Sequence, residues 1–446
     1  MNKDQSTLKK FWLTYISFML LAIIWMTIDS AQAQSYVFKN GQVFNGKRFI
    51  KADVFVENGV FVKKLSNKAD SIIELHGQYV IPPFADAHTH NLAGKWGLQA
   101  VVNKYLEEGT FYVQVLTNPY RSASKVQKQF NQPHTLDVSY AHGGLTCTFG
   151  HPFPTYEILA HRAFGPNVNW AKIKKNRKAE NNAYWFLDTK AQVEAKWNKI
   201  MAHRPDVIKI FLLDAANYKK LYNNGEVGGK GLSPEVAELI VKKAHQARLK
   251  VWAHIETAED FRLGLRIGID GFGHMPGYGG KKDTKKFYPT MKELRQVAKQ
   301  GIAITPTTSW AEVYATQYKN RKPIFDTVKM QASNEILKNE FKRYRKAGVN
   351  VVIGSDRYGL TANVEVDYLR KHIGVYSNKE LLTMWCETTA KAIYPKRKIG
   401  QITPGYEASF LTLSGNPIKD FDYTKKIRLR FKQGHFIHLK SSAKNQ

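Results

Sequence analysis

The middle of the chain alternates short apolar runs with longer amphipathic stretches, and this alternation constrains the fold more than any other feature of the sequence. The amphipathic stretches include SPEVAELIVKKAHQAR and NEILKNEFKRYRKAG. Such alternation predicts parallel strands joined by helical crossovers, and eight units favour a closed TIM (β/α)8 barrel over an open sheet. The predicted strands are 81–87, 110–116, 136–140, 207–212, 250–253, 268–273, 302–305 and 350–354. The predicted fold class is therefore α/β, with the barrel over residues 81–399.

The interval between residues 140 and 207 contains no evident strand. It is much longer than an ordinary connection between a strand and a helix. We therefore expect an extended loop with helices, lying over the barrel mouth.

The two ends of the chain share a different pattern. From about residue 35 to residue 80, apolar and polar residues alternate, and the Asn-Gly pairs that begin at Asn40, Asn45 and Asn58 predict tight hairpin turns. The segment KIRLRFKQGHFIHLK near the C-terminus has the same character. Neither piece is long enough to close its own core, so we expect residues 34–80 and 400–446 to pair in one small β-sandwich domain.

The first 33 residues have the pattern of a secretory signal peptide. Three lysines precede an apolar stretch from residue 11 to residue 28, and Ala31-Gln32-Ala33 offers the small residues that a signal peptidase requires. We expect residues 1–33 to be removed and the protein to be exported, to the periplasm or the extracellular space. The alternative is an uncleaved anchor, because the apolar stretch approaches the length of a membrane span. Membrane contact is expected only through this segment.

The chain is strongly basic, with 67 Lys and Arg against 37 Asp and Glu and a net charge of +30. The cations are scattered, and no motif has the spacing that nucleic-acid recognition requires, so we expect no nucleic-acid partner. Weak attraction to an anionic cell envelope is the expected consequence of the charge. The two cysteines, Cys147 and Cys386, permit at most one disulfide, and the sequence leaves open whether they pair.

Histidine and aspartate stand at the C-terminal ends of several predicted strands, and a lysine lies inside another. The run IPPFADAHTH ends in His88 and His90, which point to one face because residues i and i+2 share a side of a strand. Barrel active sites lie at this end of the strands. Each residue alone could be a cap, a snorkelling lysine or a core histidine, but together they predict a metal centre. The remaining members are Lys209 in IKIF, His254 in VWAH, His274 in GIDGFGH and Asp356 in VVIGSD.

These residue types suit one chemical task. Imidazoles and a carboxylate are ligands for zinc and related divalent ions, which need an open position for water if they are to catalyse. Burial and neighbouring cations would push Lys209 towards its neutral form. A neutral amine can react with carbon dioxide and become an anionic carbamate.

This set of motifs resembles the amidohydrolase superfamily, within it the branch similar to imidazolonepropionase and to the amidohydrolase-type prolidases. The resemblance covers nearly everything after the first 33 residues and includes PFADAHTH, the lysine in PDVIKIF and the closing KIGQITPGYEASFLTLSGNPI. It implies two divalent ions, with zinc favoured, and a carbamate derived from carbon dioxide on the lysine. By this resemblance the ligands are His88, His90 and Asp356 for one ion and His254 and His274 for the other, with carboxylated Lys209 bridging them.

The implied reaction is hydrolysis of a carbon-nitrogen bond in a small molecule, which can be an amide, a cyclic amide or a small peptide. The ions would activate a water molecule and polarise the carbonyl. Asp356 would take the proton of that water and deliver it to the leaving nitrogen. A metal-dependent esterase or lactonase is the alternative, and a non-catalytic envelope binding protein is disfavoured because no ligand is lost. A homo-oligomer is left open.

The sequence also departs from the family pattern. Pro83 stands where a glycine is usual, Ser409 where an acidic residue is usual, and TFGHP around His151 resembles a loop that often reads Gly-Gly-His. The pair after His254 is Ile255-Glu256, where prolidase-like members often have an aromatic residue. We expect His151, Glu256 and Arg357 to face the barrel mouth and contact substrate. Arg357 would suit a substrate carboxylate and Glu256 an amine.

Overall fold

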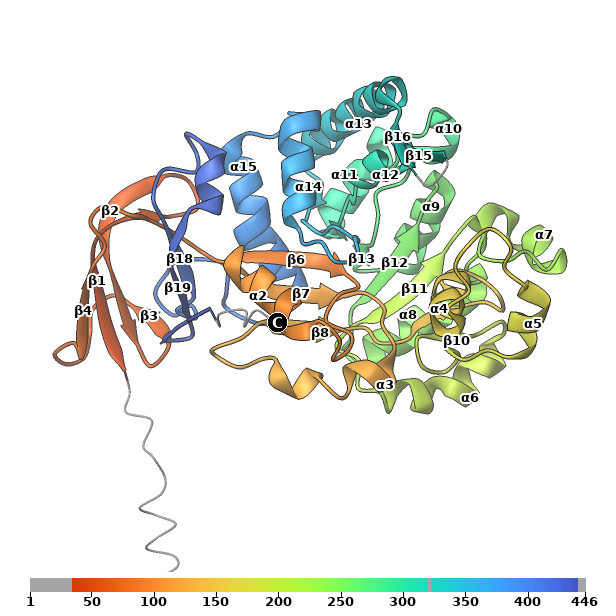
Figure 1. Cartoon of the computed structure of the whole chain (residues 1–446), viewed down its shortest axis with the longest axis horizontal. Helices are drawn as coiled ribbons and strands as arrows, with labels where there is room; N and C mark the ends of the chain where they lie inside the picture. Colours follow the sequence, from red (N-terminus) through yellow and green to blue (C-terminus); the bar gives the residue numbers. More distant parts are fainter. Residues whose placement is uncertain (1–33, 320–321, 440–446) are drawn as a thin grey trace, which may run out of the picture.

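The computed structural model describes residues 34–319 and 322–439, so the predicted signal segment lies outside the described residues. A sheet built from both ends of the chain lies at one end of the molecule, beside a larger α/β body (Figure 1). Within the described ranges, no helix is long and apolar enough to cross a membrane.

The α/β body contains two parallel sheets, with the strand orders β6-β7-β8 and β10-β9-β11-β12-β13-β14-β17. Its longer strands, β6, β7, β8, β11 and β12, are buried along their whole length. Parallel strands are buried in this way because helices cover the sheet. Each predicted strand overlaps an observed one, but these ladders do not join the strands into one closed sheet. The bounds are β6 (Phe84–Thr89), β7 (Thr110–Val115), β8 (Asp137–Tyr140), β11 (Ile208–Leu212), β12 (Val251–Ile255), β13 (Gly271–Phe272), β14 (Ala303–Ile304) and β17 (Asn350–Val351).

The prediction that residues 141–206 contain no strand is wrong. This interval contains β9 (Gly144–Thr146), which pairs with β11, and β10 (Tyr184–Phe186), which pairs with β9. Each strand has three residues, which is too short for a hydrophobic period to show in the sequence. The rest of the interval does carry helices, as expected. They are α4 (Phe153–His161), α5 (Trp170–Lys175) and α6 (Lys190–Met201).

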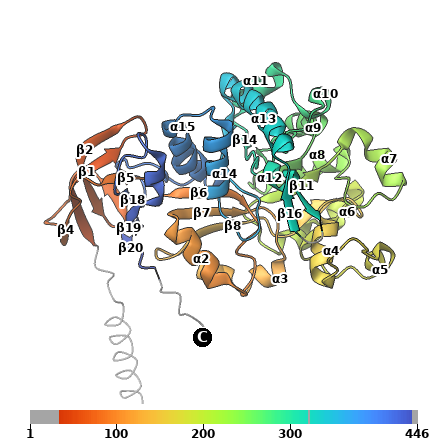
Figure 2. The same ribbon diagram turned by 45° about the horizontal axis from the view of Figure 1, so that its top comes forward.

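The helices of the α/β body surround the parallel strands (Figure 2). Their ends follow local capping chemistry. The hydroxyl of Ser233 accepts the N–H of Val236 at the start of α8 (Pro234–Gln246), and a reciprocal capping box starts α9 (Ala258–Ile267). The other helices are α2 (Leu98–Glu107), α3 (Tyr120–Ala123), α7 (Tyr218–Asn223), α10 (Thr284–Phe287), α11 (Met291–Gln300), α12 (Trp310–Ala315), α13 (Thr327–Ala347), α14 (Asn363–Tyr368), α15 (Asn378–Thr383) and α16 (Thr389–Ile393).

This body also contains two π-helical turns, a short hairpin and the 3-10 helices η1 (Gln127–Gln129) and η2 (Ala215–Asn217). The π-helical turns η3 (Leu369–Ile373) and η4 (Met384–Thr388) continue α14 and α15. A small antiparallel hairpin, β15 (Thr316–Lys319) and β16 (Lys322–Phe325), connects α12 to α13.

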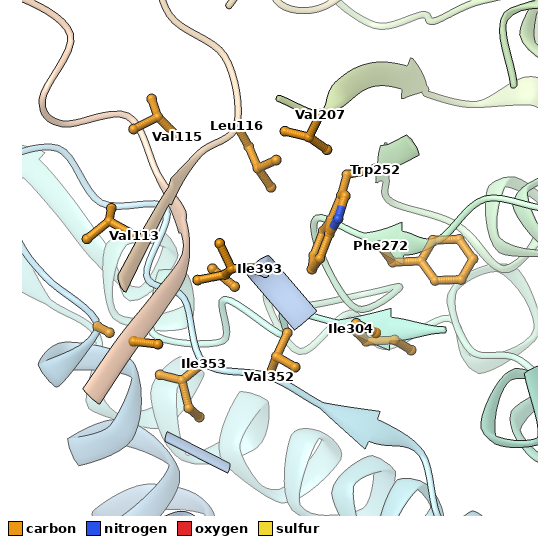
Figure 3. Close-up of a cluster of buried hydrophobic side chains, with 14 of the residues drawn as sticks. Val113, Val115, Leu116, Val207, Trp252, Phe272, Ile304, Val352, Ile353 and Ile393 are labelled. Carbon is orange, nitrogen blue, oxygen red and sulfur yellow. The ribbon is translucent and has the colours of Figure 1, made fainter. Parts of the chain in front are cut away.

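The apolar core of the α/β body fills the space between the strands and the helices. Figure 3 shows side chains from β7, β12, β13 and β14 gathered in one cluster with Ile393 of α16. Trp252 is the largest side chain of the cluster shown, and it is 1% exposed. Cys147 and Cys386 are both buried and unpaired, so the disulfide that the sequence permits is not formed.

The small sheet has the order β20-β19-β18-β5-β1-β2-β3, with β4 beside β1. The two ends of the chain meet where β18 pairs antiparallel with β5. Aromatic side chains fill its core, and Phe38 and Phe410 meet edge to face at 4.9 Å. The exact domain boundaries stay predictions. The bounds are β1 (Ser35–Phe44), β2 (Phe49–Glu57), β3 (Val60–Val62), β4 (Ser71–Glu74), β5 (Tyr79–Ile81), β18 (Phe410–Leu413), β19 (Ile427–Lys432) and β20 (His435–Phe436).

The three Asn-Gly pairs behave differently. Asn58 and Gly59, with φ of 55° and 72°, form the predicted two-residue turn between β2 and β3. Asn45 begins the turn that joins β1 to β2. The prediction of a turn at Asn40 is wrong, because Asn40 lies inside β1, where the ladder with β2 shifts register as at a bulge.

A buried ion pair joins the small sheet to the α/β body. The ammonium of Lys432 in β19 is 0% exposed and lies 2.7 Å from a carboxylate oxygen of Asp137 in β8. The other oxygen of Asp137 lies 2.7 Å from the guanidinium of Arg397. Asp137 therefore keeps one cation if the other is removed.

Candidate active site

The C-terminal ends of the parallel strands surround one cavity of about 270 Å³. Eight of the nine predicted site residues line it, and Arg357 does not. The eight are His88, His90, His151, Lys209, His254, Glu256, His274 and Asp356.

Backbone carbonyls orient His88, which lies in β6, and His90, which directly follows this strand. Nδ1 of His88 donates to the carbonyl of Gly273 at 2.6 Å, and Nδ1 of His90 donates to the carbonyl of Thr117 at 2.9 Å. With the proton on Nδ1, the lone pair of each Nε2 faces the cavity. Metal-binding imidazoles are oriented in this way by their outer hydrogen bonds.

His274 is oriented by a side chain rather than by a carbonyl. Its Nδ1 lies 2.7 Å from the hydroxyl of Thr307, and that hydroxyl donates to the carbonyl of Pro306 at 2.8 Å. The hydroxyl therefore accepts from Nδ1, and Nε2 of His274 is left free. The pKa of His274 lies well below its ordinary value because the ring is buried, so the imidazole is neutral.

Asp356 lies among these rings. One oxygen is 2.8 Å from Nε2 of His90 and 3.4 Å from Nε2 of His88, and the other oxygen is 3.7 Å from Nε2 of His274. Burial alone would raise the pKa of Asp356, but the three imidazoles outweigh it and hold this pKa well below its ordinary value. Its φ of 54° is unusual for a residue other than glycine, and such strain concentrates at functional sites.

Two buried nitrogen atoms of the site have no hydrogen-bond partner within the described part of the chain. They are Nζ of Lys209, a residue 2% exposed, and Nε2 of His254, a residue 5% exposed. Burial lowers the pKa of Lys209 to about 7, although the charge of Asp356 acts in the opposite direction. A side chain at Gly273 would collide with Nζ of Lys209, so the glycine leaves room for the amine.

The donor set fits a divalent metal ion. Ligand atoms of His88, His274 and Asp356 lie within 4.8 Å of one another. The unpartnered nitrogens of Lys209 and His254 lie in the same cavity, where a metal ion and a carbamate would satisfy them. Neutral imidazoles and a carboxylate are the ligands that zinc prefers.

His151 and Glu256 reach the cavity near His254. The ring of His151 stacks on the ring of His254 with centroids 4.6 Å apart. A carboxylate oxygen of Glu256 lies 3.9 Å from Nε2 of His254, which is too long for a hydrogen bond. The backbone N–H groups of Glu256 and Thr257 donate to Asp260 in the first turn of α9. The loop that carries Glu256 is therefore fixed by the capping of the next helix.

Arg357 is turned away from the cavity. Its guanidinium donates to the carbonyl of Ser309 at 3.2 Å and lies 5.7 Å from the centroid of the Trp310 indole. Trp310 lines the cavity, so Arg357 lies behind a cavity wall rather than in it. The expectation that Arg357 contacts substrate directly finds no support in this placement.

Sequence reasoning missed the aromatic lining of the cavity. Tyr358 follows Asp356 by two residues and Tyr278 follows His274 by four, so only their proximity to predicted ligands could have indicated them. Phe211 follows Lys209 by two residues in the same strand, so the two-residue period could also have indicated it. The other three lie on helices whose sequence gives no sign of facing the site. The aromatic residues that line the cavity are Tyr156, Phe211, Tyr278, Trp310, Tyr314 and Tyr358.

Comparison with known proteins identifies the family. The model of the amidohydrolase family matches residues 79–437, which is most of the chain, so the protein belongs to the amidohydrolase family. Members act on small substrates, and the family indicates a hydrolase of carbon-nitrogen bonds. A curated relative, a 5-methylthioadenosine/S-adenosylhomocysteine deaminase of Thermococcus sibiricus, is 39% identical over 62 residues. That match spans 13% of this chain and 15% of the relative.

Solved structures share the fold. A Xaa-Pro dipeptidase with bound methionine superposes with a TM-score of 0.69 and 16% identity, over 91% of this chain and 100% of the other. The ochratoxinase of A. niger superposes with a TM-score of 0.68 and 17% identity, over 91% of this chain and 95% of the other. Molinate hydrolase superposes with a TM-score of 0.67 and 14% identity, over 91% of this chain and 95% of the other. Prolidase-like proteins are thus among its structural neighbours.

Proposed function

We propose that this protein is a metal-dependent amidohydrolase that cleaves an amide, a cyclic amide or a small peptide. The observation that carries the proposal is the convergence of His88, His274 and Asp356, with the unpartnered nitrogens of Lys209 and His254 in the same cavity. Family membership supports hydrolysis of a carbon-nitrogen bond.

The proposed metal centre holds two divalent ions, with zinc favoured. When bound, such ions lower the pKa of a coordinated water and polarise the scissile carbonyl. His88, His90 and Asp356 would hold one ion and His254 and His274 the other. Lys209, as a carbamate, would bridge them.

The chain's own residues then have distinct roles. Asp356 takes the proton from the attacking water and returns it to the leaving nitrogen, which leaves as an amine. The ring of His151 is neutral because burial holds its pKa well below its ordinary value. It can donate or accept a hydrogen bond at the reacting centre, but it brings no charge. The aromatic walls exclude water from the substrate.

Metal analysis followed by substrate screening tests the proposal. The purified protein should contain about two divalent ions per chain, as binuclear sites do, and should hydrolyse members of a panel of N-acyl amino acids, dipeptides and cyclic amides. Cleavage of esters or lactones alone would favour the esterase alternative. A protein that binds no metal would contradict the proposal.

The Asp356→Asn variant tests the proton transfer separately from metal binding. Asn keeps the shape and can offer an oxygen, but it cannot accept and return a proton. The variant should fold, keep at least one metal ion and lose about two or more orders of magnitude in turnover. Full turnover with metal bound would contradict this role.

The Lys209→Ala variant tests the carbamate. Metal content and activity should fall together, and a short carboxylic acid should restore part of both. Unchanged metal stoichiometry would show that Lys209 only lines the cavity.

We further propose that the parallel strands form one closed eight-stranded barrel and that the small sheet is a β-sandwich. Two backbone hydrogen bonds support closure of the barrel. The N–H of Ala87 donates to the carbonyl of Ile353 at 2.8 Å, and the N–H of Asp206 donates to the carbonyl of Tyr140 at 2.8 Å. A high-resolution crystal structure would test both assignments.

Export to the periplasm or the extracellular space is also a proposal, and it rests on the sequence of residues 1–33. Sequencing the N-terminus of the mature protein would test it. A mature chain that begins after residue 33 supports cleavage, whereas an intact N-terminus found in the membrane fraction supports the anchor.

A further inference from the structure

The cavity holds one acidic side chain that the proposed chemistry does not use. Glu256 lines the cavity, and its side chain is 40% exposed, which leaves the carboxylate open to a ligand. Its backbone is held by Asp260, so the side chain is presented from a fixed position. Within the described residues, the one ion-pair contact of this carboxylate is the 3.9 Å approach of Nε2 of His254, and Lys281 and Lys286 act on its charge from further away.

The position of Glu256 limits which part of a substrate it can contact. Its carboxylate lies 3.9 Å from Nε2 of His254, which places it at the reacting end of the cavity rather than at the rim. In an α-aminoacyl group, the amine nitrogen lies about 2.5 Å from the carbonyl carbon, from bond lengths of about 1.46 and 1.52 Å. A lysine or arginine side chain of a substrate carries its charge several bonds further away. Glu256 is thus placed for an α-ammonium group.

The charges that line the cavity point to the same ligand. Lys209 is the only lysine or arginine among the lining residues, and it is committed to the proposed metal centre. Arg357, the sequence candidate for a substrate carboxylate, lies behind Trp310. The lining residues therefore provide a carboxylate that suits a substrate amine. They provide no uncommitted lysine or arginine that would bind a substrate carboxylate.

Aromatic rings form the wall beside Glu256. Tyr278 and Tyr314 join their hydroxyls at 3.0 Å, and Trp310 lies 6.0 Å from Tyr314 between ring centroids. The faces of such rings attract cations and also bury apolar side chains. The ammonium of Lys281, which lies 5.1 Å from the centroid of Tyr314, shows that this ring accommodates a cation.

We infer that Glu256 is a specificity-determining residue that selects α-aminoacyl amides with a free ammonium group, whose side chain packs on the wall formed by Tyr278, Trp310 and Tyr314. The inference rests on the proposed amide hydrolysis at the same site. It names the class of substrate that the site takes. N-acylated amides, which lack the charge, are the poorer substrates.

Binding of a paired set of probes tests the inference without any catalytic turnover. The probes are L-phenylalaninol, which carries an ammonium group, and N-acetyl-L-phenylalaninol, which does not. Titration calorimetry on the full-length metal-loaded protein should show about tenfold or more tighter binding of the ammonium probe, the scale of a charge-assisted hydrogen bond. Glu256→Gln should remove this preference, whereas Glu256→Asp should keep part of it.

The control is Glu238→Gln, which removes an exposed carboxylate from α8 and should leave the preference unchanged. Metal content is measured for every variant. Equal binding of the two probes by the unaltered protein would overturn the inference, and so would a preference that survives Glu256→Gln. Loss of metal from the Glu256→Gln protein would also overturn it, because Glu256 would then be a metal ligand.

Hydrolysis of matched substrates separates this inference from the proposed function. Phenylalanine p-nitroanilide should be cleaved with a kcat/KM about tenfold or more above that of its N-acetyl form. Equal or faster cleavage of the N-acetyl form would overturn the role of Glu256 and leave amide hydrolysis standing. A preference for the ammonium probe in a protein that cleaves no amide would instead contradict the proposed function.

Discussion

Glu365 is predicted to be the residue that holds His274 in its orientation, although it touches neither the cavity nor the ring. It lies in α14 and is 0% exposed. One carboxylate oxygen accepts from the N–H of Thr308 at 2.7 Å and from its hydroxyl at 2.6 Å, and the other accepts from the N–H of Ser309 at 2.8 Å. The preceding residue, Thr307, accepts the hydrogen bond of His274.

The cost of Glu365→Ala follows from these contacts. The substitution leaves two buried N–H groups and one hydroxyl without an acceptor, and each unsatisfied group costs about 1 to 3 kcal/mol. Because the loop relaxes and water reaches part of the space, we expect a loss of about 3 to 5 kcal/mol in the free energy of unfolding. In Glu365→Gln, the amide oxygen can still accept from Thr308, but the amide NH2 group then faces the N–H of Ser309. Two donors meet there, and that N–H loses its acceptor. That variant should lose about 1 to 3 kcal/mol.

Urea unfolding and metal analysis check this prediction together. Both variants should lose stability in the stated order, and Glu365→Ala should also bind metal less tightly because Thr307 no longer orients His274. The control Glu238→Ala, on the exposed face of α8, should change stability by less than about 0.5 kcal/mol. Unchanged stability and metal affinity in Glu365→Ala would refute the reasoning.

Three further predictions concern the site and the domain contact. In bicarbonate buffer, metal uptake by metal-free protein should accelerate as pH rises through about 7, because Lys209 must be neutral to form a carbamate. Equal rates at pH 6 and pH 8 would contradict this. Gly354→Ala should lose about 1 to 3 kcal/mol in unfolding experiments and bind less metal, since its Cβ would lie 2.6 Å from the backbone nitrogen of His88. Lys432→Met should lose about 2 to 4 kcal/mol, as Asp137 keeps only one cation. A stability equal to that of the unaltered protein would show that this ion pair contributes nothing.

The sequence pointed to eight residues that do line one cavity, because their signal is local, while the metal-binding roles stay a proposal. His88 and His90 share a face through the two-residue period of a strand. Lys209 lies inside a strand, and the other candidates stand near or after strand ends. The same rules recovered the turn at Asn58, whose two positive φ angles suit Asn-Gly. They failed at Asn40, because a bulge and a turn require the same residue types and only the partner strand distinguishes them.

The walls of the cavity were not predictable in this way. Trp310 and Tyr314 lie on α12, and Tyr156 lies on α4, and neither helix has a pattern that marks a side facing the site. Their positions depend on how each helix packs against its neighbours. The placement of Arg357 has the same origin, since its sequence position beside Asp356 gives no information about which carbonyl its guanidinium meets.

By itself, the sequence determined the alternation of strands and helices, the strand segments that carry or precede His88, Lys209 and Asp356, and the family that those motifs resemble. Short-range periods and spacings encode these features, so they can be read without coordinates. Only the tertiary structure decided that Arg357 lies behind Trp310 while Glu256 lines the cavity, and that Glu365 holds the backbone beside Thr307. These contacts join segments far apart along the chain, and their geometry is set by side-chain packing, which no local pattern records.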